Sequence, residues 1–136
     1  MCLKRDSVSK LNRKLRVLIV DDHLGWRKTL RIYLASLPEL RVVGEATDGE
    51  SALEACQIML PDLVLMDINM PGMDGFETAR LLLDHYPRLW VIGISAEVTP
   101  NAQQRAQDAG FRAVIAKDML LDYLEPAITA TIEMFY

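Results

Sequence analysis

Five polar side chains each come directly after a short apolar run, and their types suit the binding of a cation and a phosphoryl group. They are Asp21, Asp22, Asp67, Ser95 and Lys117. Three carboxylates at one place repel one another unless a cation lies between them, and oxygen-only ligands favour a hard ion such as Mg²⁺. The lysine adds a mobile positive charge and the serine a small donor, which suits a doubly charged phosphoryl group. Because an Asp after a strand also caps turns, the full set, rather than any one residue, predicts a site.

The apolar runs predict strands that are buried on both faces. They are Val17–Val20, Arg41–Ala46, Leu63–Met66, Leu89–Ile94 and Ala113–Ala116. Short runs rich in Val, Ile and Leu are typical of a parallel sheet that helices cover on each side. The carboxyl ends of the strands form the ligand-binding edge of such a sheet, so the five polar side chains would meet there.

Helix-length stretches lie between the runs, with apolar residues three and four positions apart. Apolar stripes occupy residues 26–37, 76–86 and 124–135. Thr99-Pro100 predicts a helix start, and Gly110 predicts its end. Five strands alternating with five helices predict a single doubly wound, flavodoxin-like α/β domain with right-handed crossovers and the parallel strand order 2-1-3-4-5.

Positive charge is concentrated at the start of the chain. Residues 1–16 sum to +5, whereas residues 17–136 sum to −9. We therefore predict that residues 1–14 form a flexible basic leader and that residues 15–136 form the domain. An acidic body lacks the basic patch that nucleic acid requires, so no DNA binding by this chain alone is expected. No apolar run has the length of a signal peptide's hydrophobic region or of a membrane span, which predicts a cytoplasmic protein without membrane contact.

Four segments strongly resemble bacterial two-component response-regulator receiver domains. They are Val17–His23, Pro61–Asp67, Met70–Gly75 and Ile94–Ala96. The resemblance covers roughly residues 15–133, and the stretch Val42–Ala46 with the pair Lys117-Asp118 looks most like receivers that precede a LuxR-type helix-turn-helix domain. It implies a phosphorylation-controlled signalling switch that assists its own phosphorylation and dephosphorylation, not an enzyme.

The resemblance also implies how Asp67 becomes phosphorylated. Asp67 would accept the phosphoryl group from the phospho-His of a sensor histidine kinase or phosphotransfer protein, or from a small acyl phosphate. Asp22, Asp67 and the backbone carbonyl of Asn69 would bind Mg²⁺ directly, and Asp21 would act through water. Lys117 would pair with the phosphoryl oxygens.

Further residues near these positions are expected to respond to the phosphoryl group or to limit its lifetime. The Ser95 hydroxyl would follow the phosphoryl oxygens when the switch closes. Asn69 and Glu97 lie two residues after Asp67 and Ser95, where the resemblance implies that they tune dephosphorylation. His23 is interpreted as a loop residue.

The sequence departs from the family pattern at two places. Val114 stands at the switch position where family members commonly carry Tyr or Phe, and its stiff, short side chain predicts signalling through Ser95 and the loop after it. Asp118 stands where many receivers have a cis-Pro, which predicts a trans bond or a loosened loop. A smaller oddity is Pro126: Asp122 and Glu125 predict a capping box, which places Pro126 in the first turns of the last helix.

Two other functions stay open at this point. A Mg²⁺-dependent phosphohydrolase or phosphotransferase of similar fold would typically carry a second Asp two residues after its nucleophile, but Asn69 cannot shuttle a proton. A degenerate receiver would act without phosphorylation; Val114 favours it mildly, and the intact acidic set argues against it.

The resemblance and the surface composition also predict partners. The fourth and fifth helices would contact a second copy of the chain or a downstream protein, through a polar surface containing Asn101, Gln103, Gln104, Arg105 and Gln107 and the apolar end of the last helix. The first helix would contact the kinase through Arg27, Lys28, Arg31 and Ile32.

Overall fold

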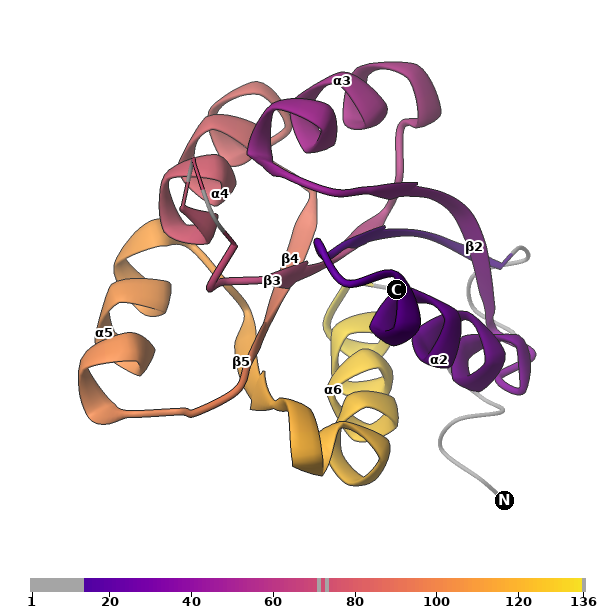
Figure 1. Ribbon diagram of the computed structural model, residues 1–136. Coiled ribbons are helices and arrows are strands. Elements are labelled where there is room, and N and C mark those ends of the chain that lie inside the picture. Colours follow the sequence, from indigo (N-terminus) through magenta and orange to yellow (C-terminus); the bar gives the residue numbers. More distant parts are fainter. Residues whose placement is uncertain (1–13, 71, 73, 136) are drawn as a thin grey trace.

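A five-stranded parallel sheet forms the middle layer of the protein (Figure 1). The computed structural model describes residues 14–70, 72 and 74–135. The strand order is β2-β1-β3-β4-β5, and every neighbouring pair is parallel. The strands are β1 (Leu15–Val20), β2 (Leu40–Ala46), β3 (Leu63–Asp67), β4 (Trp90–Ser95) and β5 (Ala113–Ala116).

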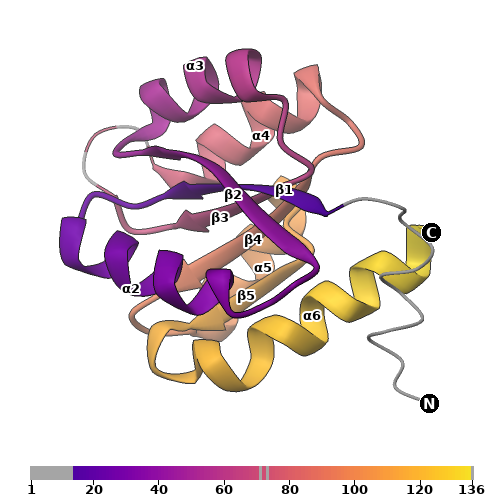
Figure 2. The same cartoon turned by 90° about the vertical axis from the view of Figure 1, so that its right-hand side faces the viewer.

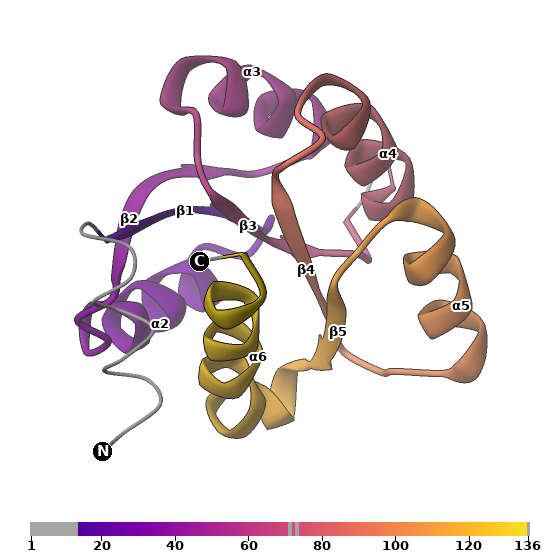
Figure 3. The ribbon, with the colours of Figure 1, turned by 180° about the vertical axis from the view of Figure 1, so that it is seen from behind.

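Helices cover both faces of this sheet, as the buried apolar runs require. Helices α2 and α6 lie on one face, and α3, α4 and α5 lie on the other (Figures 1 and 2). The view from behind shows the same division (Figure 3). The helices are α2 (Leu24–Ala35), α3 (Gly49–Met59), α4 (Gly75–His85), α5 (Pro100–Ala109) and α6 (Leu120–Phe135), with a 3₁₀ turn at Lys117–Met119.

Alternate side chains of the strands feed two separate hydrophobic cores. In β1, Val17 and Ile19 pack with α2 and α6, whereas Leu18 and Val20 pack with α3, α4 and α5. All four side chains are at most 1% exposed. Because successive strand residues point to opposite faces, a solid apolar run supplies both cores at once.

Helix ends follow the local signals of the sequence. The Thr99 hydroxyl accepts a hydrogen bond from the backbone N–H of Ala102 at 3.1 Å, and Pro100 is the first helical residue of α5. Gly110 ends α5 with φ of 96°, a conformation that glycine adopts without steric cost. Both of these sequence predictions are confirmed.

The predicted start of the last helix is wrong. The 3₁₀ turn at Lys117–Met119 leads directly into α6 at Leu120, so Asp122 and Glu125 lie inside the helix and form no capping box. Pro126 also lies inside α6. The apolar periodicity of the sequence does not reveal this turn, which already has helical backbone geometry and so moves the start of α6 ahead of Asp122. No cis peptide bond occurs in the described part of the chain, so the predicted trans bond between Lys117 and Asp118 is confirmed.

The predicted fold class and strand order are confirmed, and the described residues contain the five predicted helices. Residues 1–13 of the predicted leader lie outside the described residues. Among the described helices, none combines the length and the apolar character needed to cross a membrane.

Candidate functional site

The polar side chains singled out in the sequence meet at the carboxyl edge of the sheet. Asp21 and Asp22 follow β1, Asp67 and Ser95 are the last residues of β3 and β4, and Lys117 follows β5. Asp21, Asp67 and Ser95 are each at most 3% exposed. Carboxylates this deeply buried need charged or hydrogen-bonding partners, and the site provides both.

Lys117 lies between two buried carboxylates. Its Nζ is 3.5 Å from Asp21 Oδ2 and 3.5 Å from Asp67 Oδ2, and it also lies 5.4 Å from the centre of the Trp26 ring. One ammonium group therefore offsets part of the charge of two acids, and the indole ring lies against the same cation.

A chain of hydrogen bonds connects Asp67 to Ser95. The backbone N–H of Asn69 donates to Asp67 Oδ1 at 2.8 Å, and the Asn69 side-chain amide donates to Ser95 Oγ at 3.0 Å. The Ser95 hydroxyl donates to the backbone carbonyl of Glu97 at 2.7 Å. The structure thus brings Asn69 and Ser95 together, while Glu97, which is exposed, joins the chain through its backbone.

The acidic groups fit a hard divalent cation. Ligand atoms of Asp21, Asp22, His23 and Asp67 all lie within 4.8 Å of one another. Asp21 Oδ2 is buried and accepts no hydrogen bond within the described residues, although Lys117 Nζ lies 3.5 Å from it. Buried carboxylate oxygens beside an exposed one suit Mg²⁺, which takes one or two carboxylates and keeps several waters.

The loop after β1 is held in place by Arg27. Its guanidinium donates to the backbone carbonyl of Asp21 at 2.8 Å and pairs with Glu45 at 2.9 Å. Arg31 pairs with the same carboxylate, and these two arginines hold the pKa of Glu45 below its ordinary value, the Arg31 hydrogen bond contributing most. The Arg27 side chain is only 12% exposed, so less of it is available to contact the kinase than the sequence suggested.

Burial raises the pKa of Asp67 above its ordinary value, because desolvation disfavours the carboxylate. The Asn69 N–H and the Lys117 charge oppose this rise without cancelling it. The folded protein therefore holds this proton more tightly than the unfolded chain does.

This raised pKa predicts a pH-dependent stability difference between the wild type and Asp67→Asn. A raised acid pKa favours the folded state at low pH, and that contribution is lost as pH rises from about 4, the ordinary Asp value, through the folded-state pKa. Without divalent cations, Asp67→Asn should gain unfolding free energy over the wild type across this window, by about 1.4 kcal/mol for each tenfold difference in proton affinity. Urea unfolding at a series of pH values from about 4 upward measures this difference in unfolding free energy, and a difference that narrows as pH rises would contradict the prediction.

Val114 and Phe111 differ in how they relate to the site. Val114 is half-buried in β5 and packs partly against the core on the α5 side. Phe111 is buried, and its ring lies 5.8 Å from the Phe76 ring, centre to centre. Its ring also fills the space over Gly93, where an added Cβ would lie 2.9 Å from it. Phe111 is thus fixed in the core and does not replace the missing aromatic switch.

Sequence reasoning missed the contribution of His23. It is the N-cap residue of α2, as a loop position would allow, but its Nδ1 lies 3.1 Å from Asp22 Oδ1 and 3.4 Å from Asp21 Oδ1. The available signal was its place directly after two acids at the end of a predicted strand.

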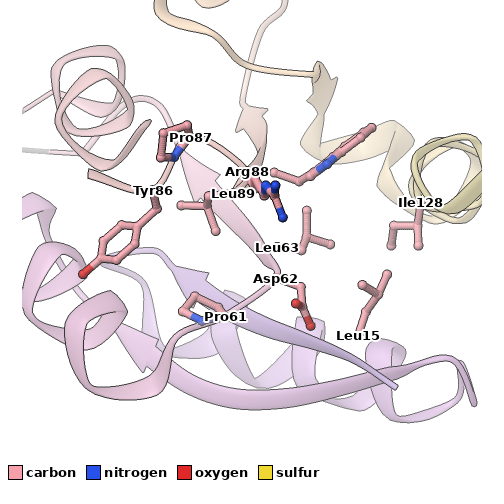
Figure 4. A pocket seen from close by; sticks show the side chains of 10 residues that line it. Leu15, Pro61, Asp62, Leu63, Tyr86, Pro87, Arg88, Leu89 and Ile128 are labelled. Carbon is pink, nitrogen blue, oxygen red and sulfur yellow. The ribbon is translucent and has the colours of Figure 1, made fainter. Parts of the chain in front are cut away.

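A well-formed apolar pocket lies at the opposite edge of the sheet. Its volume is about 460 Å³, and apolar side chains from β1, β3, the turn before β4 and α6 surround it (Figure 4). Asp62, just before β3, and Arg88 are the charged residues of its lining. No residue of the acidic cluster lines this pocket. A search for the functional site by pocket shape alone would therefore select the wrong edge of the sheet.

Comparison with known proteins identifies the family. A family model described as the response regulator receiver domain matches residues 17–129. The chain therefore belongs to the response regulator receiver domain family, the phosphorylation-controlled signalling switches of two-component systems. This confirms the resemblance on which the sequence predictions rested.

Individual relatives agree with that assignment. A protein-glutamate methylesterase/protein-glutamine glutaminase from Syntrophus aciditrophicus is 42% identical over 76% of this chain and 30% of the relative. The transcriptional regulatory protein DegU from Brevibacillus brevis is 35% identical over 85% of this chain and 49% of the relative. The chain thus spans half or less of the length of these curated relatives.

Two solved receiver structures are matched over most of their length. The signal receiver domain of the response regulator NarL from Mycobacterium tuberculosis is 33% identical, with a TM-score of 0.82 over 89% of this chain and 98% of that one. A LuxR-family two-component response regulator from Aurantimonas sp. SI85-9A1 is 26% identical, with a TM-score of 0.84 over 89% of this chain and 86% of that one. The predicted likeness to receivers of LuxR-type regulators is confirmed.

Proposed function

We propose that Asp67 is the phosphoacceptor of this receiver domain. The observation that carries the proposal is the buried Asp67 carboxylate, with one oxygen fixed by the Asn69 N–H and the other 3.5 Å from Lys117. Asp67 attacks the phosphorus atom of a phospho-His or a small acyl phosphate, forming a P–O bond. The bond to the donor breaks, and its electron pair leaves with the imidazole or the carboxylate. Incorporation of one phosphoryl group from acetyl phosphate, followed by intact mass, tests this.

The surrounding residues supply alignment and charge. Lys117 offsets the negative charge of the incoming oxygens, which is the main requirement of phosphoryl transfer. Asp22, Asp67 and the Asn69 backbone carbonyl are the proposed Mg²⁺ ligands, with Asp21 acting through water. When bound, Mg²⁺ offsets negative charge at Asp67 and the phosphoryl group. Burial of Asp21 Oδ2 without a hydrogen bond supports a cation at this position.

Removal of the Asp22 carboxylate should abolish Mg²⁺ binding as Trp26 reports it. Trp26 is a suitable reporter because Lys117, which pairs with Asp21 and Asp67, lies against its ring. In Asp22→Ala, a Mg²⁺ titration should leave Trp26 fluorescence unchanged, whereas the wild type should show a saturable change. A Trp90→Phe background isolates the Trp26 signal, and a normal titration in Asp22→Ala would argue against the proposed ligand.

Asn69 and Glu97 are proposed to set the lifetime of the acyl phosphate. The Asn69 amide reaches the Ser95 hydroxyl beside Asp67, where it can hold an attacking water nearly in line. In the double variant Asn69→Leu/Glu97→Leu, the dephosphorylation rate should fall by about tenfold or more. The apolar side chains can no longer position the attacking water. Decay of isolated phosphoprotein measures the rate. An unchanged or faster decay would count against this role.

A phosphorylation-dependent contact with another protein is the proposed output. The start of α6 presents large exposed apolar side chains, Leu121 at 66% and Tyr123 at 53% exposure, beside an apolar hollow that includes Val114. Together with the polar surface of α5 they suit a second copy of the chain or a downstream protein. The kinase or phosphotransfer protein is proposed to contact α2 through exposed Lys28, Arg31 and Ile32.

The proposed setting is cytoplasmic, where a kinase can reach the domain.

The formal charges of residues 17–136 sum to −9, and a phosphoryl group adds further negative charge. DNA retention by these 136 residues alone is therefore not expected, since phosphate backbones would be repelled.

A further inference from the structure

The imidazole of His23 is held at the rim of the acidic cluster by the backbone around it. The backbone N–H of His23 donates to Asp21 Oδ1 at 2.8 Å, which fixes the turn that begins α2. This places Nδ1 3.1 Å from Asp22 Oδ1 and 3.4 Å from Asp21 Oδ1. A nitrogen and a carboxylate oxygen this close share either a proton or a metal ion.

The separations match those of a metal that accepts nitrogen as well as oxygen. Bond lengths of about 2.0–2.2 Å place neighbouring ligand atoms of a tetrahedral Zn²⁺ site about 3.3–3.6 Å apart. The two distances from His23 Nδ1 lie close to that spacing, and the four candidate ligand atoms all lie within 4.8 Å of one another. Small movements of exposed Asp22 and His23 would therefore complete a site.

A second observation at the same place points to a cation. The Asp21 side chain is 2% exposed, yet its Oδ2 accepts no hydrogen bond from the described residues. Lys117 Nζ, at 3.5 Å and shared with Asp67, offsets only part of its charge. A buried carboxylate oxygen left in this state favours a cation inside the cluster.

We propose that His23 determines metal specificity at this site, so that a borderline divalent cation such as Zn²⁺ binds there more tightly than Mg²⁺ and in competition with it. Imidazole suits Zn²⁺, whereas Mg²⁺ takes oxygen ligands and loses its waters reluctantly. The inference rests on the proposed location of the Mg²⁺ site. With His23, Asp22 and Asp21 as ligands beside Asp67, Zn²⁺ would lie in the same cluster as the carboxylate that accepts the phosphoryl group, and by displacing Mg²⁺ it would oppose phosphorylation.

Chelator-buffered Zn²⁺ and plain Mg²⁺ titrations of the full 136-residue chain test the proposal, read by Trp26 fluorescence and by calorimetry. The wild type should bind Zn²⁺ more tightly, and Mg²⁺ in sufficient excess should displace it. Loss of an outer partner of a metal ligand already costs about 10- to 100-fold in affinity, so His23→Ala should reduce the Zn²⁺-to-Mg²⁺ affinity ratio at least about tenfold. Asp22→Ala should weaken the binding of both cations.

Two control variants exclude other binding groups. His85→Ala removes the other histidine, which lies in α4, and should leave both affinities unchanged. Cys2→Ser removes the thiol at the start of the chain and should also leave Zn²⁺ binding unchanged.

Three results would overturn the inference: Zn²⁺ binding no tighter than Mg²⁺ binding in the wild type, an unchanged affinity ratio in His23→Ala, or Zn²⁺ binding that Asp22→Ala does not weaken. Failure of the proposed function would look different. In that case acetyl phosphate would not modify Asp67 with saturating Mg²⁺, whatever the Zn²⁺ affinity.

Discussion

The Asp67→Asn protein should gain no phosphate from acetyl phosphate and Mg²⁺, under conditions that phosphorylate the wild type. An amide oxygen carries no negative charge and is a poor nucleophile, while the size and shape of the side chain are retained. The amide oxygen introduced at position 67 can still accept the hydrogen bond from the Asn69 N–H, so the loop should keep its geometry. Intact mass spectrometry after incubation measures the phosphoryl gain directly, and the expected loss is complete.

The same strand offers a matched control at its other end. Asp62 directly precedes β3, and its Oδ2 accepts a hydrogen bond from the backbone N–H of Arg16 at 2.9 Å, far from the acidic cluster. Asp62→Asn makes the same chemical change and should be phosphorylated as the wild type is. Equal phosphate gain by Asp67→Asn and the wild type would refute the assignment.

Gly75→Ala should destabilise the protein by about 1–3 kcal/mol, because the added methyl group has no space. An ideal Cβ at Gly75 would lie 2.7 Å from Ile68 Cα and 3.1 Å from the Asp67 carbonyl oxygen. Both neighbours are backbone atoms, so relief requires movement of either α4 or the chain just after Asp67. We therefore expect slower phosphorylation as well as lower stability. Urea unfolding and the initial rate of phosphate gain are the two measurements.

Gly25 supplies the comparison for this substitution. It is the second residue of α2, and apart from its chain neighbours and the helix's own backbone no atom lies within 4 Å of its ideal Cβ position. Gly25→Ala should be neutral or stabilising by up to about 1 kcal/mol, since alanine favours the helix. If Gly75→Ala were as stable as Gly25→Ala, the close approach of α4 to the end of β3 would not constrain residue 75.

The sheet and the identity of the site residues could be predicted because both depend on patterns along the chain. Short apolar runs predict buried parallel strands, and the rule that ligands bind at the carboxyl edge then selects Asp67, Ser95 and Lys117. Each of these residues lies at that edge in the structure. Proline and glycine positions predicted helix ends such as Gly110 for the same reason, since their conformational limits are local.

Side-chain partners could not be predicted in the same way. The sequence does not show that Lys117 is shared equally between Asp21 and Asp67, or that the Asn69 amide reaches Ser95. These contacts depend on side-chain rotamers and on the register between neighbouring strands. The start of α6 was missed because the 3₁₀ turn before it has only three residues, too few to show a periodicity of its own. His23 was missed because its backbone position alone does not place its ring.

The strand order also determines when this site exists during folding. Lys117 and Asp67 are 50 residues apart in sequence, and Asn69 and Ser95 are 26 apart, yet both pairs meet at one sheet edge. Contacts between such distant residues form late, because loop closure must precede them. A partly folded chain without β5 in place therefore lacks Lys117 beside Asp67, and two carboxylates remain unscreened. The candidate cation ligands Asp21, Asp22 and Asp67 lie at the ends of β1 and β3, which pair directly, so a bound cation would offset this charge even before β5 brings in Lys117.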